Sequence, residues 1–312
     1  MKLVKAEKPT FYFIGVTTQQ SSIMKLFPLW AKEMGIDADI KGIDIPIHAD
    51  KTEYQQVTRF LKDDELSLGA LVTTHKIDLY EAASHHFDYL DPYAVNFHEL
   101  SCISKKDGQF RGFAKDPITS GLSLEAFIPE NYWKEYRGEV FIMGAGGSAI
   151  AIAAYLLNSE NGENIPSKIY VSNRSQPRLD SMKDIINKIN PDANIEYLLA
   201  QTAEDNDKIL AKVKEHSLIV NATGLGKDRP GSPLSNGCQF PKNNFVWELN
   251  YRGDLLFLHQ ANEQRNEMRL HVEDGWIYFI HGWSQVIAEV FQINLDENKF
   301  NRLVQIANSL RN

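Results

Sequence analysis

Cysteine is scarce in this sequence: Cys102 and Cys238 are the only two in 312 residues, and they lie far apart in the chain. This number and spacing exclude a disulfide framework and match no metal-binding motif. We interpret both as small apolar residues of the core. The separations between several histidines along the sequence also match no recognised metal-binding motif, so no metal site is predicted. The histidines in question are His75, His85, His86 and His98.

Long apolar runs and an excess of positive charge are also missing. The longest apolar runs, such as Ser148 to Leu157, fall short of the roughly 20 residues that a membrane span needs. The segment Met1 to Pro9 is too polar for a secretory signal. A formal net charge of -8 argues against nucleic acid or an anionic membrane as partner, although a local arginine cluster can still bind a small anion. We therefore expect a cytoplasmic protein whose partner is a small molecule.

The length favours two domains, and both halves of the chain alternate strands with helices. Such alternation predicts an α/β fold with mostly parallel sheets and crossover helices. In the first half we predict strands at 11–16, 40–47 and 68–73, helices at 22–34, 52–61 and 76–83, and a hairpin of 100–104 with 109–113 around Asp107-Gly108. A helical stretch follows at 120–128, and the polar segment 129–138 is a plausible domain boundary.

The second alternation is the clearer one. Its predicted strands are 140–143, 168–172, 195–199, 218–221 and 245–249, and its predicted helices are 149–157, 179–189, 206–213 and a largely helical tail at 277–310.

A glycine-rich loop stands between the first strand and the first helix of this second half. It consists of Gly144, Ala145, Gly146, Gly147 and Ser148. Gly144 suits the tight turn, and Gly146 lets the backbone approach a pyrophosphate that rests on the following helix N-terminus. This context predicts a dinucleotide-binding loop. The alternative is a glycine-rich turn without a ligand.

The next strand ends in Ser172-Asn173-Arg174-Ser175, without the carboxylate that usually bonds the ribose 2′-hydroxyl of NAD. Arg174 and Arg178 lie four residues apart, where both guanidinium groups can bind one 2′-phosphate. NADP is therefore the predicted cofactor. Two solvated arginines at a helix start are the alternative, which the helix dipole disfavours unless an anion is present.

A third loop, Asn221-Ala222-Thr223, follows the apolar strand 218–220. Loops after parallel strands meet at the carboxyl edge of the sheet, where cofactors bind. We therefore add these three residues to the predicted NADP site.

These elements, in this order, resemble the shikimate/quinate dehydrogenase family. The likeness is strongest from Val140 to Tyr251, and Glu248-Leu249-Asn250-Tyr251 is similar to the family's acid-x-x-Tyr, with Glu in place of Asp. The resemblance implies a substrate domain at 1–122 to which helices at 277–312 return, and a Rossmann NADP-binding domain at 123–276. It also implies reversible reduction of a ring ketone by NADPH, with the substrate in the cleft between the domains.

The resemblance further implies a catalytic pair. Gly69 to Lys76 looks like the family's strand that ends in the catalytic lysine, and Gly112 to Asp116 looks like the segment that ends in the catalytic aspartate. A lysine at position 76 can donate a proton to the developing alkoxide, and Asp116 would orient it. From the residues alone, the alternative for Lys76 is a surface lysine at a helix start, which the bare sequence favours, and the alternative for Asp116 is a turn residue before Pro117.

The substrate contacts implied by the resemblance are Ser21, Thr73, Asn96, Tyr251 and Gln285. Other positions depart from the family pattern. Counted back from Lys76, the family's strand asparagine and threonine fall on Ala70 and Val72, whereas a one-residue shift places the threonine on Thr73. The family's Asn-Thr before the aspartate is Ala114-Lys115.

We therefore predict an NADP-dependent oxidoreductase, a monomer or homodimer, acting on a small cyclic polyhydroxy carboxylic acid such as shikimate or quinate, in aromatic amino acid biosynthesis. A dehydrogenase of a different small alcohol or ketone on the same scaffold, or a non-catalytic NADP-binding regulatory module, are the alternatives.

Overall fold

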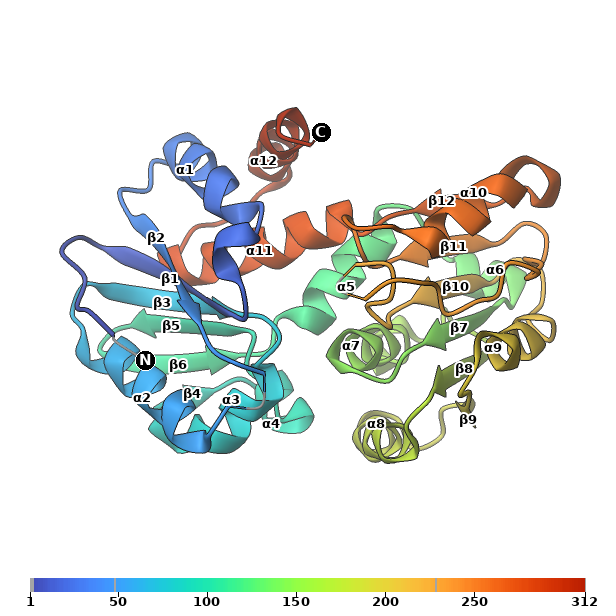
Figure 1. Cartoon of the computed structure of the whole chain (residues 1–312), viewed down its shortest axis with the longest axis horizontal. Helices are drawn as coiled ribbons and strands as arrows, with labels where there is room; N and C mark the ends of the chain where they lie inside the picture. Colours follow the sequence, from blue (N-terminus) through green and yellow to red (C-terminus); the bar gives the residue numbers. More distant parts are fainter. Residues whose placement is uncertain (1–2, 48, 228, 312) are drawn as a thin grey trace. The chain divides into compact units, whose positions relative to one another are not determined.

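The computed structural model describes residues 3–47, 49–227 and 229–311, which form two compact units (Figure 1). Unit 1 consists of Met1–Lys115 and Ile280–Asn312, and unit 2 of Asp116–Phe279. The predicted α/β class with two parallel-rich sheets is confirmed. The junctions of the units differ from the predicted ranges 1–122, 123–276 and 277–312, and the assignment of one domain to substrate and one to NADP stays a prediction.

Unit 1 is built on a six-stranded sheet of order β2-β1-β3-β5-β6-β4. The pairs β1–β2, β1–β3 and β4–β6 are parallel, and β3–β5 and β5–β6 are antiparallel. Its elements up to the junction are β1 (Thr10–Gly15), α1 (Ile23–Met34), β2 (Asp39–Asp44), α2 (Lys51–Asp63), β3 (Ser67–Val72), α3 (Lys76–Ala83), β4 (Tyr89–Leu90), α4 (Pro92–Phe97), β5 (Cys102–Lys106) and β6 (Gln109–Phe113), with short 3-10 helices at Thr18–Gln20 and Ser84–His86.

The hairpin of β5 and β6 turns as its sequence predicts. Asp107 and Gly108 both have positive φ, 52° and 75°, which is the backbone of the tight turns that twist with antiparallel strands. The predicted second strand is shorter than expected: β2 ends at Asp44 and not at Ile47. β1, on which β2 pairs, itself ends at Gly15, opposite Asp44, so the ladder has no partner strand beyond that point.

Two C-terminal helices belong largely to unit 1. They are α11 (Trp276–Phe291), which runs through the junction, and α12 (Glu297–Ser309). The Trp30 indole of α1 donates a 2.9 Å hydrogen bond to the Leu303 carbonyl, so α12 packs on α1. The predicted helical tail is interrupted because Asp296 caps α12, its side chain accepting a hydrogen bond from the Lys299 amide at 2.8 Å.

Unit 2 contains a wholly parallel sheet of order β12-β11-β10-β7-β8-β9. Numbered from β7, this is the order 3-2-1-4-5-6 of a Rossmann domain. The elements are α5 (Asp116–Glu125), α6 (Tyr132–Tyr136), β7 (Glu139–Met143), α7 (Gly147–Leu156), β8 (Lys168–Asn173), α8 (Gln176–Ile189), β9 (Ile195–Leu199), α9 (Ala203–Leu210), β10 (Leu218–Asn221), β11 (Phe245–Glu248), α10 (Leu256–Met268) and β12 (His271–Glu273), with a 3-10 turn at Ser159–Asn161. Every residue of β7 and β10 is buried, as expected for central parallel strands covered on both faces.

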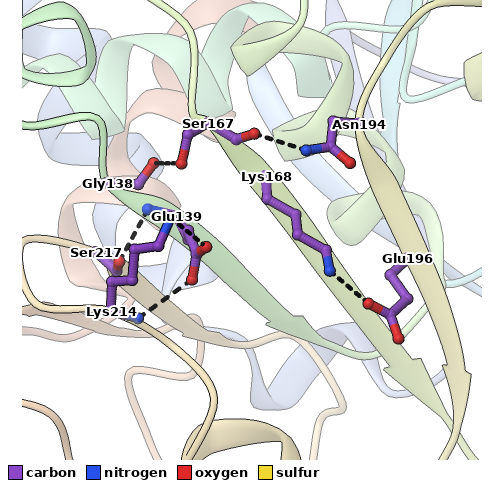
Figure 2. Close-up of polar contacts among 8 residues, drawn as sticks. All are labelled: Gly138, Glu139, Ser167, Lys168, Asn194, Glu196, Lys214 and Ser217. Carbon is purple, nitrogen blue, oxygen red and sulfur yellow. Dashed lines mark hydrogen bonds and ion pairs between the residues drawn. The ribbon is translucent and has the colours of Figure 1, made fainter.

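Polar contacts fix the strands of this sheet at their amino ends (Figure 2). The buried Glu139 donates its amide to the Ser217 hydroxyl at 2.8 Å, and its carboxylate pairs with Lys214 at 3.0 Å. Lys168 of β8 pairs with Glu196 of β9 at 2.6 Å. These contacts hold the strands in register at one edge and leave the opposite, carboxyl edge to the loops of the candidate site.

Three elements of unit 2 were not expected from the sequence, and one was displaced. Both α10 and β12 lie where no element was predicted, and the segment 129–138, predicted as a domain boundary, contains α6. The predicted helix 206–213 is α9, which begins earlier because Thr202 and Asp205 form a capping box.

Both cysteines are buried and free, as predicted, and burial raises the pKa of the Cys238 thiol to about 11. Across the described ranges, no helix is long and apolar enough to cross a membrane. The same residues form no cluster of histidine, cysteine and carboxylate side chains suited to a metal ion.

Candidate functional site

The glycine loop of unit 2 lies between the buried end of β7 and the first turn of α7. Gly144 has φ of +114°, and a Cβ atom there would lie 2.6 Å from the Ala222 carbonyl oxygen, so only glycine fits. At Gly146 a Cβ atom would meet no protein atom within 4 Å. The amino end of α7 has no side-chain cap and no acidic residue in its first turn, which leaves amide groups and a positive dipole end for an anion.

These features surround a pocket of about 530 Å³ at the carboxyl edge of the sheet. Nine of the predicted cofactor contacts line it, namely Gly144, Ala145, Gly146, Asn173, Arg174, Ser175, Arg178, Ala222 and Thr223. Gly147, Ser148 and Asn221 do not belong to the lining. Loops from β7, β8 and β10 thus converge on one cavity, as the position of cofactors in parallel sheets requires.

Two arginines after strand β8 line this pocket, Arg174 in the turn and Arg178 near the start of α8. The Asn173 side chain accepts a 3.1 Å hydrogen bond from the Ser175 amide, which shapes the turn before α8. Arg174 and Arg178 are exposed and, within the described chain, form no ion pair. The first turn of α8 contains no acidic residue and no side-chain cap. Two unpaired guanidinium groups beside a helix N-terminus are suited to a phosphate.

Hydrogen bonds from buried polar side chains stabilise the loop after β10. Asn221 accepts hydrogen bonds from the Thr223 hydroxyl at 2.7 Å and from its amide at 3.1 Å, and donates to the Glu248 carboxylate at 2.6 Å. Glu248 also accepts from the amide and side chain of Asn250 at 2.8 and 2.7 Å. Asn221 and Glu248 are fully buried, so both shape the loop from within.

Burial raises the pKa of Glu248 from 4.5 to about 7, although its three hydrogen-bond donors oppose the shift. Between these values the folded protein retains a proton that the unfolded chain has lost. The free energy of unfolding therefore includes a contribution from Glu248 that falls as pH rises from 4.5 to about 7, by about 3 kcal/mol at most.

The Glu248→Gln variant should not show this loss. The variant should be less stable than wild type at pH 5, and this difference in unfolding free energy should become smaller as pH rises to about 7, because only wild type loses stability over that range. Denaturant unfolding at several pH values measures the difference. Exposed Glu263 on α10 offers the matched control, Glu263→Gln, whose difference from wild type should stay constant. Parallel curves for wild type and Glu248→Gln would contradict the assignment.

In unit 1, Thr73 and Lys76 follow the end of β3. The Thr73 amide donates to the Ile14 carbonyl at 3.1 Å, and the Lys76 amide donates to the Thr73 carbonyl at 3.1 Å, so a tight turn leads into α3. The Thr73 methyl group lies 3.1 Å from where Gly15 would place a Cβ atom. This brings Thr73 beside the carboxyl end of β1. Lys76 is half-buried, and Ser21, also half-buried, follows the 3-10 helix Thr18–Gln20, two residues before the start of α1.

The other predicted substrate contacts lie on helices. Asn96 is exposed on α4, and Gln285 is half-buried on α11. Glu289, one helical turn beyond Gln285, pairs with Lys115 at 2.7 Å. Lys115 therefore fills the position where the family pattern has threonine, and its ammonium group is held by a carboxylate.

Asp116 and Tyr251 belong to unit 2. Asp116 is the first residue of α5 and is 8% exposed. The Tyr251 ring packs against Phe279 and Trp276, with centroids 4.6 and 5.4 Å apart. The substrate roles predicted for these residues stay predictions.

Several residues of the pocket were not found from the sequence. They are Ala200, Gln201, Thr202, Ala203 and Asn206 after β9, and Leu225, Arg229, Ser232 and Pro233 after β10. Residues 221–223 were selected because loops that follow parallel strands meet at the carboxyl edge of the sheet. The same argument applies to the loop after β9, so the first group could have been predicted. Arg229 had no such signal, because it lies well inside the long loop between β10 and β11, away from the strand end.

Curated proteins with sequences similar to this chain are described as shikimate dehydrogenase (NADP(+)). The protein of Lactococcus lactis subsp. cremoris is 26% identical over 178 residues, which span 57% of this chain and 59% of the relative, less than two thirds of its length. A protein of Thermus thermophilus is 26% identical over 246 residues, 78% of each chain. No family model matches the chain.

Solved structures share the whole fold. Quinate dehydrogenase from Corynebacterium glutamicum in complex with NAD has a TM-score of 0.73 at 19% identity and covers 97% of this chain and 99% of its own. Shikimate 5-dehydrogenase from Thermus thermophilus in complex with NADP(H) and shikimate has a TM-score of 0.69 at 20% identity, over 96% and 99%. At this identity the likeness concerns the fold.

Proposed function

We propose that this chain is a divergent member of the shikimate/quinate dehydrogenase family and that it interconverts a ring ketone and a hydroxyl with NADP. The substrate class is a small cyclic polyhydroxy acid such as shikimate or quinate. The observation that carries the proposal is the pocket of unit 2, in which an uncapped glycine loop lies opposite two arginines and no carboxylate ends β8.

The residues of this pocket fit NADP and not merely a dinucleotide. Open space over Gly146 leaves room for a pyrophosphate against the α7 amides. Arg174 and Arg178 would hold the 2′-phosphate, where an NAD-selective site has a carboxylate. When bound, NADPH supplies the hydride.

We propose that Lys76 supplies the proton. Its ammonium group would donate to the carbonyl oxygen as negative charge develops there, and would stabilise that charge. When Lys76 has donated its proton, that carbonyl oxygen is a hydroxyl group. Asp116 would accept a hydrogen bond from this hydroxyl and fix the orientation of the substrate. Ser21, Thr73, Asn96, Tyr251 and Gln285 would contact the rest of the ring acid.

A dehydrogenase of another small alcohol or ketone is a second candidate. It is favoured by Ala70 and Val72, which lack the polar groups that the family pattern has there, and by Lys115, which places a charge, paired with Glu289, where that pattern has threonine. A change of polar side chains around a substrate alters selectivity more readily than it alters hydride chemistry.

Steady-state assays of NADPH formation test the proposal, with shikimate, quinate and neutral polyols as substrates. We expect oxidation of a ring acid that depends on NADP. Turnover of a neutral polyol alone would transfer the activity to the second candidate, and NADP binding without turnover of any substrate would indicate a regulatory module. We further propose a cytoplasmic monomer or homodimer, which light scattering distinguishes from larger assemblies.

A further inference from the structure

Arg229 is a third arginine of the pocket, and neither the family likeness nor a place directly after a parallel strand assigns it a role. It lies in the loop between β10 and β11 and is exposed. Its guanidinium Nη2 donates a 3.3 Å hydrogen bond to the Thr223 carbonyl, on the loop that directly follows β10.

The backbone around Arg229 is held in place. The Gly226 amide donates to the Arg229 carbonyl at 2.7 Å, and the Gly226 carbonyl accepts from the Leu255 amide at 3.0 Å. Gly226 has φ of +87°, which a side chain would strain. Arg229 therefore projects from a loop tied at its base, which lowers the conformational entropy lost when the guanidinium binds a ligand.

The position of this loop indicates which phosphate Arg229 reaches. In the sheet, β7 lies between β10 on one side and β8 on the other. The Ala222 amide donates to the Met143 carbonyl at 2.8 Å, and the Thr223 amide nitrogen lies 3.3 Å from where Gly144 would place a Cβ atom. Arg229 is thus tethered beside the glycine loop, whereas Arg174 and Arg178 follow β8.

We propose that Arg229 binds the pyrophosphate of the dinucleotide and is indifferent to the 2′-phosphate. This inference rests on the proposed function, because it assumes that the pocket holds a dinucleotide. The α7 amides supply only partial charge to the two phosphate groups. A guanidinium tethered beside the glycine loop adds a full positive charge and a charge-assisted hydrogen bond.

The test compares three ligands by calorimetric titration: NADP+, NAD+ and adenosine 2′-monophosphate, which lacks the pyrophosphate. Arg229→Ala should weaken NADP+ and NAD+ by the same factor, about tenfold or more, and leave adenosine 2′-monophosphate unchanged. Arg229→Lys should recover part of the lost affinity, because lysine restores the positive charge but not the planar group that donates two parallel hydrogen bonds. Exposed Arg265 on α10 provides the control Arg265→Ala, expected to match wild type.

Unchanged binding of NADP+ and NAD+ in Arg229→Ala would overturn the proposal. So would a loss confined to NADP+ and adenosine 2′-monophosphate, which would move Arg229 to the 2′-phosphate. If wild type binds neither dinucleotide, this proposal and the proposed function both fail. The expected pattern without turnover of any substrate would uphold the role of Arg229 and contradict the enzymatic activity alone.

Discussion

Replacement of Lys76 by alanine is expected to lower turnover of the ring substrate by a factor of about 10²–10⁴ and to leave NADP binding intact. The two effects separate because Lys76 opens α3 in unit 1, whereas every residue that lines the nucleotide pocket belongs to unit 2. Alanine removes both the proton donor and the charge that stabilises the developing alkoxide. Steady-state kinetics and calorimetric titration with NADP+ measure the two quantities.

Two further variants sharpen this prediction. Lys41→Ala, which removes an exposed lysine of β2, should keep wild-type turnover. Asp116→Asn keeps the shape of the side chain but not its charge, and should also lower turnover by a large factor with the fold retained. Near wild-type rates in Lys76→Ala or in Asp116→Asn would remove that residue from the mechanism.

Replacement of Arg174 by leucine should weaken NADP+ by about 10- to 100-fold and change NAD+ by less than about twofold. The reason is that only NADP+ carries the 2′-phosphate, and one hydrogen bond to a charged group contributes about 1.5–3 kcal/mol. Arg174 stands at the carboxyl end of β8 and forms no ion pair with any carboxylate among the described residues. Titration of the variant with both nucleotides gives the two ratios directly.

Lys183→Ala is the matched control, because Lys183 is an exposed cation on α8 outside this pocket. It should change neither affinity. Equal weakening of NADP+ and NAD+ by Arg174→Leu would show that the guanidinium recognises another part of the dinucleotide.

Much of the fold could be predicted because its signals are local. The buried strand β7, the glycine loop and α7 follow one another without a gap, and Asp107-Gly108 marks its hairpin by itself. α10 was missed because its buried face contains one large apolar side chain, Phe257, beside Gln260 and Ala261. Gln260 occupies that face and satisfies its amide with the Ser235 carbonyl at 3.0 Å and the Ser232 hydroxyl at 2.7 Å. A search for periodic apolar residues does not detect a helix in which a buried glutamine interrupts the apolar face.

The candidate site divides in the same way. Gly144 and Arg174 could be predicted because each directly follows a buried strand, and strand ends meet at one edge of a parallel sheet. Arg229 reaches the pocket through a loop whose path depends on Gly226 and on the contact with Leu255, which no local pattern encodes. Lys115 likewise acquires its partner Glu289 only when α11 returns to unit 1.

The central claim is that the pocket at the carboxyl edge of the unit 2 sheet binds NADP. Calorimetric titration of the wild-type protein with NADP+ and NAD+ tests it most directly. The arrangement of Arg174 and Arg178 predicts saturable binding of NADP+ at least tenfold tighter than that of NAD+. No heat and no shift in Tm with NADP+, or a preference for NAD+, would contradict it.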